Sequence, residues 1–509
     1  MNQAIPIVFL AAFAVIMILV GMSSYKNSKS MSSFLLGGRN VGAWMSAFAY
    51  GTAYFSAVIF IGYAGKTGWQ IGVSGVWIGI GNAVLGSLLA WKLLAKRTRR
   101  MSQGLGASTM PEFFNARYMS RPMKMFSAGV IFIFLMPYAA SVYTGLGYLF
   151  NAVFPSLPFV WCMLIIAGLS AFYLVLGGYT ATTMTDFIQG IIMILGVIVL
   201  VLSIVLNPTV GGVSAGLSKL VEMTGDADLA SPFGGRNFLN LISLVLLTSF
   251  GAWGLPQMIH KFYAIRDEKS IVKGTVISTF FAGLIGAGAY FIGTFGRLFL
   301  NNTLPSQGYD KIVPDMLVAA LSGSVFSNIV LSTMLLLVLS ASMSTLSAVV
   351  LTSSSAVTVD ILGDIRPDIN KRRQMIIMRT MCFIFVAVSL FFALQNIGFI
   401  VALMAFSWGA VSGCFIGPYF WGLYWKKTTR AGAWAGMLGG LGTLLALIIA
   451  ATITKDFDEA KANAPLFGTI AMAVSFVIVP IVSSFTKKLP QDKVDNIFKC
   501  LSKDGEELQ

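Results

Sequence analysis

The chain has 509 residues, of which 56% are hydrophobic and only 11% are charged. A soluble domain carries roughly 25% charged residues, so this composition excludes a soluble globular protein and predicts one with many membrane spans. The formal net charge is +15, but the basic residues gather on one side of the predicted spans. The charge therefore indicates topology and attraction to anionic lipid, and we expect no nucleic-acid partner.

Apolar runs of about 20 residues predict thirteen membrane-spanning helices, and an odd number places the two termini on opposite sides. Basic residues follow spans 1, 3, 7, 9 and 11 and fill the tail; Lys261, for example, directly follows span 7. By the positive-inside rule, we expect a multi-pass plasma-membrane protein with its N-terminus outside and its C-terminus in the cytoplasm. The predicted spans are 5–23, 41–63, 71–91, 125–151, 159–178, 185–206, 237–260, 274–299, 325–357, 376–395, 398–424, 431–453 and 466–485.

A hydroxyl-rich stretch, Ala-Ser-Met-Ser-Thr-Leu-Ser at 341–347, lies inside the apolar span 325–357. On a helix, the carbonyl of Ala341 and the hydroxyls of Ser344 and Thr345 can converge on one point. Hard, uncharged oxygen ligands of this kind suit a small monovalent cation. The alternative is that these hydroxyls bond to carbonyls of their own helix or to a neighbouring helix.

Two spans carry residues that interrupt helices: Tyr-Gly-Thr-Ala-Tyr-Phe-Ser at 50–56, and Ser-Phe-Gly-Ala-Trp-Gly-Leu-Pro at 249–256. Gly and Pro free backbone groups for binding, although a kinked but closed helix is the alternative. The two interruptions are five spans apart, as expected of two inverted five-helix repeats whose first helices unwind at the bilayer midplane. The repeats would cover about 41–206 and 237–424, and spans 1, 12 and 13 would be peripheral.

Taken together, these elements resemble the sodium/solute symporter family over about residues 5–490. The resemblance implies an all-α leucine-transporter-type fold, with about thirteen helices that include two inverted five-helix repeats. It also implies a single transporter domain at 1–490, a short cytoplasmic tail at 491–509, and sodium-coupled uptake of a small organic solute rather than an enzyme. The similar motifs are Phe-Leu-Leu-Gly-Gly-Arg at 34–39, Leu-Gly-Gly-Tyr at 176–179, Thr-Asp-Phe-Ile-Gln-Gly at 185–190, Met-Ser-Thr-Leu-Ser at 343–347 and Gly-Leu-Tyr-Trp at 422–425.

The resemblance also assigns ligands to a sodium ion, which would be the cofactor. They are the carbonyl oxygens of Thr52, Phe55 and Ala341, and the hydroxyl oxygens of Ser344 and Thr345. This set contains no carboxylate, which agrees with the chemistry inferred from the hydroxyl-rich stretch alone.

Some members of the family bind a second sodium ion, and the residues Asp186, Ser344 and Ser347 match that pattern. A further serine of the pattern is Ala348 here, which leaves the second ion in question. Asp186 would otherwise mark the exit of the ion to the cytoplasm. Its alternative is a purely structural one, as an N-terminal helix cap, where a carboxylate is favoured in any case.

The solute is expected to bind between the two interruptions, with spans 4 and 11 closing the site. Each aromatic side chain in that region has simple packing as its alternative. Helix dipoles at the interruptions, together with bound sodium, could hold a carboxylate without an arginine. The candidate solute-binding residues are Tyr54, Ser56, Tyr138, Ser249, Trp253, Ser407 and Trp408.

The sequence is closest in pattern to the sodium/pantothenate and sodium/proline branches of the family. Ser56 and Tyr138 match the proline branch, but Tyr54 occupies the position of its aspartate, and Thr248 and Ala252 those of its aromatics. We therefore expect a carboxylate such as pantothenate or a monocarboxylate, with a proline-type amino acid as the alternative. The pantothenate branch is matched at 52–57, 250–256, 296–297 and 313–315.

Other classes of membrane protein are less well supported by the residues. A single histidine, His260, and four scattered cysteines supply no nucleophile–base pair or metal cluster for an enzyme. A channel would show filter repeats or charged rings, and a solute sensor would carry a signalling domain after Phe485. We expect a small-molecule solute and the lipid bilayer as partners, and no obligate protein partner.

Overall fold

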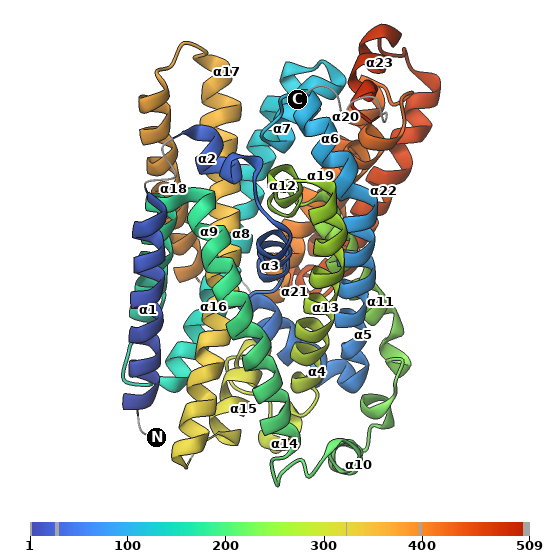
Figure 1. Ribbon diagram of the computed structural model, residues 1–509. Helices are drawn as coiled ribbons and strands as arrows, with labels where there is room; N and C mark the ends of the chain where they lie inside the picture. The colour runs from blue at the N-terminus through green and yellow to red at the C-terminus, as the bar shows by residue number, and fades with distance from the viewer. Residues whose placement is uncertain (1–2, 26–29, 322, 396–399, 502–509) are drawn as a thin grey trace.

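The computed structural model describes residues 3–25, 30–321, 323–395 and 400–501. Its long helices run roughly along one common direction, whereas short ones such as α10 (Val213–Thr224) and α12 (Pro256–Ala264) lie across it (Figure 1). In this part of the chain, eleven helices are long and apolar enough to cross a membrane. Helix α1 (Ala4–Tyr25) begins at the lower end of Figure 1, and α23 (Gln491–Lys499) lies at the upper end.

The long helices of the bundle alternate with short segments, several of which replace parts of a predicted span. The long ones are α8 (Arg121–Val153), α9 (Phe159–Val205), α13 (Glu268–Gly293), α16 (Val325–Ser355), α18 (Lys371–Leu394), α19 (Ile400–Tyr424), α20 (Arg430–Thr454) and α22 (Ala464–Phe485). The shorter ones are α2 (Met31–Leu36), α3 (Ala43–Tyr54), η2 (Val58–Tyr63), α4 (Ala64–Ile71), α5 (Val76–Gly81), η4 (Asn82–Leu89), η5 (Trp91–Ala95), α6 (Lys96–Gly104), α7 (Met110–Tyr118), α10 (Val213–Thr224), α11 (Phe238–Gly254), α12 (Pro256–Ala264), α14 (Gly296–Phe299), α15 (Ile312–Ala320), α17 (Gly363–Ile365) and α21 (Phe457–Ala462).

The count of eleven differs from thirteen because two predicted pairs of spans are divided differently. The pair 159–178 and 185–206 becomes a short apolar helix, Phe159–Phe172, and a long one, Gly178–Val205. The backbone turns at Gly178, whose φ of 54° is open to glycine and strained for other residues. The pair 41–63 and 71–91 becomes α3 and a helical run Val58–Gly104. The expected start of one span at 398 lies outside the described residues.

Burial places α16 at the centre of the bundle. In its most apolar stretch 94% of the residues are buried, whereas the value is 22% for both α1 and α20. Helix α16 contacts α1, α3, α8, α9 and α18. The hydroxyl-rich stretch therefore faces protein rather than lipid, and the helices that correspond to spans 1 and 12 lie at the periphery, as predicted.

Both predicted interruptions are confirmed. Helix α3 ends at Tyr54, Phe55 is extended (φ −108°, ψ 129°), and helical structure resumes in the π-helical segment η2. Helix α11 ends at Gly254, Leu255 is extended (φ −78°, ψ 119°), and α12 begins with Pro256. Proline suits the first position of a helix because its missing N–H would have no partner there.

The two interrupted elements are joined at the end of the bundle that holds α6 and α23. Val41 N donates to Ala264 O at 3.2 Å, and Arg266 N donates to Val41 O at 2.9 Å. Arg99 on α6 adds hydrogen bonds to Ile265 O at 3.1 Å and to Arg266 O at 2.5 Å. This end is therefore closed by backbone groups that fix the entry to α3 and the exit from α12.

Cysteine labelling should test the predicted sides of the membrane. Glu222 is exposed on α10 and suits the outer probe better than Gly225, whose φ of 68° strains any larger residue. Lys371, exposed at the start of α18, is the inner probe, and Cys500→Ser removes the one native cysteine that is not buried. In intact cells, an impermeant maleimide should label Glu222→Cys but label Lys371→Cys only after permeabilisation. The reverse pattern would contradict the predicted orientation.

Candidate functional site

The hydroxyl-rich stretch of α16 faces the interruption that follows α3. Thr345 Oγ1 lies 3.1 Å from Ala341 O and 3.2 Å from Ala53 O. The same atom lies 3.4 Å from Phe55 O and 3.5 Å from Thr52 O. A hydroxyl donates only one hydrogen bond at a time, so lone pairs of these carbonyls stay available to a cation.

The position of these carbonyls follows from the way α3 ends. Thr52 and Ala53 belong to the last four residues of α3, whose carbonyls have no intrahelical partner. The same carbonyls form the negative end of the helix dipole, which favours a cation. Because both residues are buried, water does not readily satisfy them. The interruption therefore leaves buried backbone oxygens of the kind that a cation could bind.

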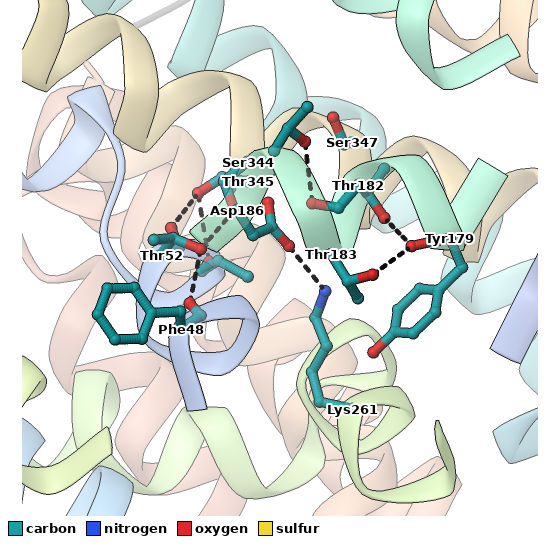
Figure 2. Close-up of polar contacts among 12 residues, drawn as sticks. Phe48, Thr52, Tyr179, Thr182, Thr183, Asp186, Lys261, Ser344, Thr345 and Ser347 are labelled. Carbon is teal, nitrogen blue, oxygen red and sulfur yellow. Dashed lines mark hydrogen bonds and ion pairs between the residues drawn. The ribbon is translucent and has the colours of Figure 1, made fainter. Parts of the chain in front are cut away.

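Ser344 contacts the same helix end through a side chain. Its Oγ donates to Thr52 Oγ1 at 2.8 Å, and Thr52 Oγ1 in turn donates to Phe48 O at 2.7 Å (Figure 2). The five predicted ligand residues are thus brought together, with Ser344 meeting the hydroxyl of Thr52. Sequence reasoning missed this hydroxyl and the carbonyl of Ala53. The free carbonyl of Ala53 could have been predicted from the position at which the helix ends. The contact of the Thr52 hydroxyl could not, because it depends on how two helices distant in the chain pack together.

Asp186 lies inside α9, about two turns beyond the bend at Gly178, so the interpretation as an N-terminal helix cap is wrong. The helix resumes directly after that bend and does not begin at 185 as expected. The Asp186 side chain is 1% exposed, and its Oδ2 lies 3.7 Å from Lys261 Nζ (Figure 2). Lys261 on α12 is itself 2% exposed, although the sequence grouped it with the basic residues of the inner surface.

Ser347, the other candidate for a second ion, donates from Oγ to Met343 O of its own helix at 2.6 Å. This is the bonding pattern that hydroxyls commonly adopt in helices. Ser347 is buried on α16, close in sequence to Ser344 and Thr345 (Figure 2).

Three of the predicted solute-binding aromatics pack together between the interruptions. Trp408 on α19 stacks on Tyr54, with ring centroids 6.2 Å apart, and meets the edge of Tyr138 on α8 at 5.7 Å. The Tyr54 hydroxyl donates to Thr248 O of α11 at 2.6 Å. Four helices therefore converge where the solute was expected: α3, α8, α11 and α19. The same aromatic contacts also fit the alternative of simple packing.

Asn82 on η4 contacts the candidate Ser249, and sequence reasoning missed it. Its Oδ1 lies 2.8 Å from Thr248 Oγ1 and 3.3 Å from Ser249 Oγ, so the amide oxygen is already engaged. Its Nδ2 is buried and has no hydrogen-bond partner among the described residues, and the same is true of Trp408 Nε1. Unpaired buried donors are costly, and an oxygen-rich solute would satisfy them. A polar amide within the apolar run 71–91 was the available signal.

Three other candidates bond to backbone groups in this state. Trp253 Nε1 donates to Leu85 O at 3.0 Å, and Ser407 Oγ donates to Phe134 O at 2.5 Å. Ser56 Oγ accepts from the N–H of Val58, two residues further along, at 3.2 Å. The contact of Trp253 fits its packing alternative, and Ser407 is likewise engaged with the backbone, while Ser56 stabilises the restart of the helix after the interruption.

A cavity of about 410 Å³ lies beside the beginnings of α11 and α22. It reaches Ser243, which precedes Ser249 by about two turns of α11. The opposite end of the bundle is closed by the backbone contacts of Arg99 and Val41. A cavity thus lies at the end where α11 begins, and hydrogen bonds join the chain segments at the other end. The cavity is lined by Lys66, Gln70, Arg236, Asn237, Leu239, Asn240, Ser243, Glu459, Ala462, Asn463, Pro465 and Leu466.

Comparison with known proteins identifies the family. The family described as "Sodium:solute symporter family" matches residues 34–440. The sodium/proline symporter of Haemophilus influenzae is 28% identical over 486 residues, which cover 95% of this chain and 94% of that protein. The sodium/proline symporter of Staphylococcus aureus is 28% identical over 492 residues, covering 95% and 92%. The family and these relatives are sodium-coupled transporters, not enzymes, as predicted.

Solved structures show the same fold. A Na⁺-coupled sialic acid symporter in a substrate-bound outward-open state has a TM-score of 0.72 at 16% identity, covering 96% of this chain and 99% of that chain. The nucleobase-cation-symport-1 family transporter Mhp1, closed with bromovinylhydantoin bound, has a TM-score of 0.52 at 13% identity, covering 92% and 98%. The predicted leucine-transporter-type fold is thus confirmed as an overall architecture.

The contacts of Thr345 predict the effect of removing its hydroxyl. Thr345→Val keeps the shape and β-branching but removes one of the clustered oxygens, which costs a bound ion about 1–3 kcal/mol. We expect sodium affinity, measured by ²²Na⁺ binding to the purified protein, to fall roughly 5- to 150-fold. Thr333→Val is the matched control, because it makes the same change on a partly exposed turn of α16. If the two variants bound sodium with equal affinity, the hydroxyl-rich stretch at 341–347 would serve only to pack helices.

The unpaired amide of Asn82 predicts a separate effect on the solute. Asn82→Leu keeps the approximate volume and removes the donor, so a solute carboxylate would lose a charge-assisted hydrogen bond of about 1.5–3 kcal/mol. The apparent affinity for the transported solute should fall roughly 10- to 150-fold, while ²²Na⁺ binding changes little. Asn496→Leu, on the exposed face of α23, is the matched control. An unchanged solute affinity would remove Asn82 from the site.

Proposed function

The chain belongs to the sodium:solute symporter family, and on that premise we propose that it is a secondary active transporter. It takes up a small organic carboxylate, such as pantothenate or a monocarboxylate, together with sodium. The observation that carries the proposal is the position of Thr345 Oγ1, within 3.1–3.5 Å of four carbonyl oxygens at the interruption after α3.

The proposed sodium site consists of the carbonyls of Thr52, Phe55 and Ala341 with the hydroxyls of Ser344 and Thr345. Such ligands re-solvate a dehydrated monovalent ion without adding a fixed charge. Because the ligands come from both α3 and α16, bound sodium would hold the two helices in one relative position. That contact gives the ion a means of biasing the conformation of the transporter.

The solute is proposed to bind beside this site, between Tyr54, Tyr138 and Trp408, with Asn82 and Ser249 as polar partners. Sodium would supply positive charge close to the solute carboxylate, so no arginine is required there. The cavity of about 410 Å³ on the side where α11 begins supplies the route of entry. Release would then need the opposite end, where Arg99 bonds to Ile265 and Arg266, to open.

A proline-type amino acid is the second candidate for the solute. It is favoured by the sodium/proline symporters among the relatives, each 28% identical to this chain. A zwitterion also carries an ammonium group, which would seek an acidic partner. Tyr54 lies in the interruption where the proline branch has an aspartate, and its hydroxyl is engaged with Thr248 O. We therefore place a carboxylate without an ammonium group first.

The finer architecture is part of the same proposal. Residues 1–490 would form one transporter domain with thirteen spans, and 41–206 and 237–424 would be inverted repeats. The chain would lie in the plasma membrane with its N-terminus outside and the tail 491–509 in the cytoplasm; residues 502–509 of that tail lie outside the described part. The interruptions of α3–η2 and α11–α12 support the repeats, since they occupy corresponding positions.

A solute sensor or a channel is the alternative from another class, and uptake by proteoliposomes separates it from a symporter. A panel of radiolabelled carboxylates and amino acids, including proline, would be tested with an imposed sodium gradient and with a proton gradient. A symporter accumulates its solute above the outside concentration only with the coupling ion. A channel equilibrates the solute, and a sensor binds it without transport.

Reciprocal binding of sodium and solute is the quantitative prediction. If both ligands stabilise the same ion-occupied, outward-facing state, each must raise the affinity of the other by the same factor. Saturating solute should therefore raise the apparent ²²Na⁺ affinity roughly 5- to 150-fold, the usual range of such coupling. Independent affinities would argue against symport.

A further inference from the structure

Asp186 and Lys261 form an ion pair in the interior of the protein, beside the proposed sodium site. Their charged atoms are 3.7 Å apart, and the two side chains are 1% and 2% exposed. Figure 2 shows the Asp186 carboxylate between the α16 hydroxyls of Ser344 and Thr345 and the Lys261 ammonium. Neither residue belongs to the sodium ligands proposed above.

A carboxylate buried to this degree requires a positive partner, because the interior solvates an isolated charge poorly. Neither oxygen of Asp186 has a hydrogen-bond partner among the described residues, so its neutralisation depends on the ion pair. Sodium or an ammonium group can each supply the one charge needed. Both together would place two cations around one anion, where their repulsion is weakly screened.

The surrounding oxygens also argue against a second ion in this arrangement. Ser347 Oγ donates to Met343 O, and Ser344 Oγ donates to Thr52 Oγ1. Ala348 contributes no side-chain oxygen. The two donating hydroxyls keep lone pairs for a cation, so the element that a second-sodium site lacks here is the oxygen at position 348, and the charge beside Asp186 is supplied by the lysine.

The protein holds Lys261 in place from two sides. The residue lies on α12, which begins directly after the interruption at Leu255 and contacts α3 and α16. Its ammonium also lies 5.1 Å from the centre of the Tyr179 ring, a distance at which a cation is attracted to an aromatic face. A cation tethered in this way is present in every transport cycle and does not exchange with the solution.

We infer that the Lys261 ammonium takes the place of a second sodium ion at Asp186, so that the transporter binds a single sodium ion, at the Thr345 cluster. The inference rests on the proposed function and goes beyond it, since it assigns the ion stoichiometry to one residue. Lys261 acts here as a positioning and charge-neutralising residue, not as a ligand of the transported ion.

The test is a direct count of bound sodium. Equilibrium binding of ²²Na⁺ to the purified full-length protein, without solute, is measured at about pH 8, where an ordinary carboxyl group is ionised. The wild type and Lys261→Arg should bind one ion per chain. Lys261→Gln exposes the Asp186 carboxylate to solution cations and should bind two. Lys273→Gln is the matched control at an exposed lysine of α13 and should bind one.

The charge pair itself is tested by neutralising each member. Asp186→Asn leaves the lysine uncompensated near the first site, so sodium affinity there should fall at least ~10-fold through repulsion. The double variant Asp186→Asn/Lys261→Gln restores neutrality and should return to one ion with near-wild-type affinity. This pair of variants keeps the test decisive even where Lys261→Gln does not fold, as judged by size-exclusion chromatography.

Each other outcome has a definite meaning. Two ions bound to the wild type would overturn this inference and leave sodium-coupled transport intact. A single site with wild-type affinity in both Lys261→Gln and Asp186→Asn would reduce the pair to a structural contact. Absence of saturable ²²Na⁺ binding to the wild type would overturn the proposed sodium coupling, and this inference with it.

Discussion

The structure depends on a helix that ends inside the protein, where its last carbonyl groups are buried away from water. Helix α3 stops at Tyr54 inside the bundle, and the carbonyls of Thr52 and Ala53 are left at its negative pole. Thr345 of the central helix α16 meets them with a hydroxyl that can serve only one of them at a time. Because donors are in short supply there, carbonyl lone pairs remain without a hydrogen bond, and the proposed sodium site uses them. Thr52 and Ala53 are both buried by the surrounding helices.

Charge balance near this helix end has two separate solutions. The carbonyl cluster consists of dipoles and carries no net charge, as the proposed reversible binding of an ion requires. Asp186 carries a full charge and is paired with Lys261, which cannot leave. The proposed sodium site on α3 and α16 and the tethered cation on α12 thus lie near each other in the interior of the protein. The uncharged carbonyl cluster suits reversible ion binding, and the ion pair suits permanent neutralisation of the Asp186 carboxylate.

The two ends of the bundle differ in how closely the chain is joined. Backbone hydrogen bonds of Val41, Ala264 and Arg266, reinforced by Arg99, close the end near α6. The other end has a cavity that reaches Ser243 on α11. The interruptions divide these elements into α3 and η2, and into α11 and α12. Helix α3 therefore follows directly after the closed end at Val41 and carries carbonyls of the proposed ion site at its other end.

The family resemblance indicated that Ser344 and Thr345 meet the end of α3, and residue types alone predicted the membrane class and both interruptions. These features are local or follow from helical spacing: Gly, Pro and hydroxyl residues act on the backbone within one or two turns. Asn82 and Lys261 required the tertiary structure. Sequence position placed Lys261 among solvated basic residues, since nothing local shows that α12 turns inward after Leu255 and brings its ammonium to Asp186. Only the packing of helices distant in the chain decides which charges are buried together, because that depends on long-range contacts and not on neighbours in sequence.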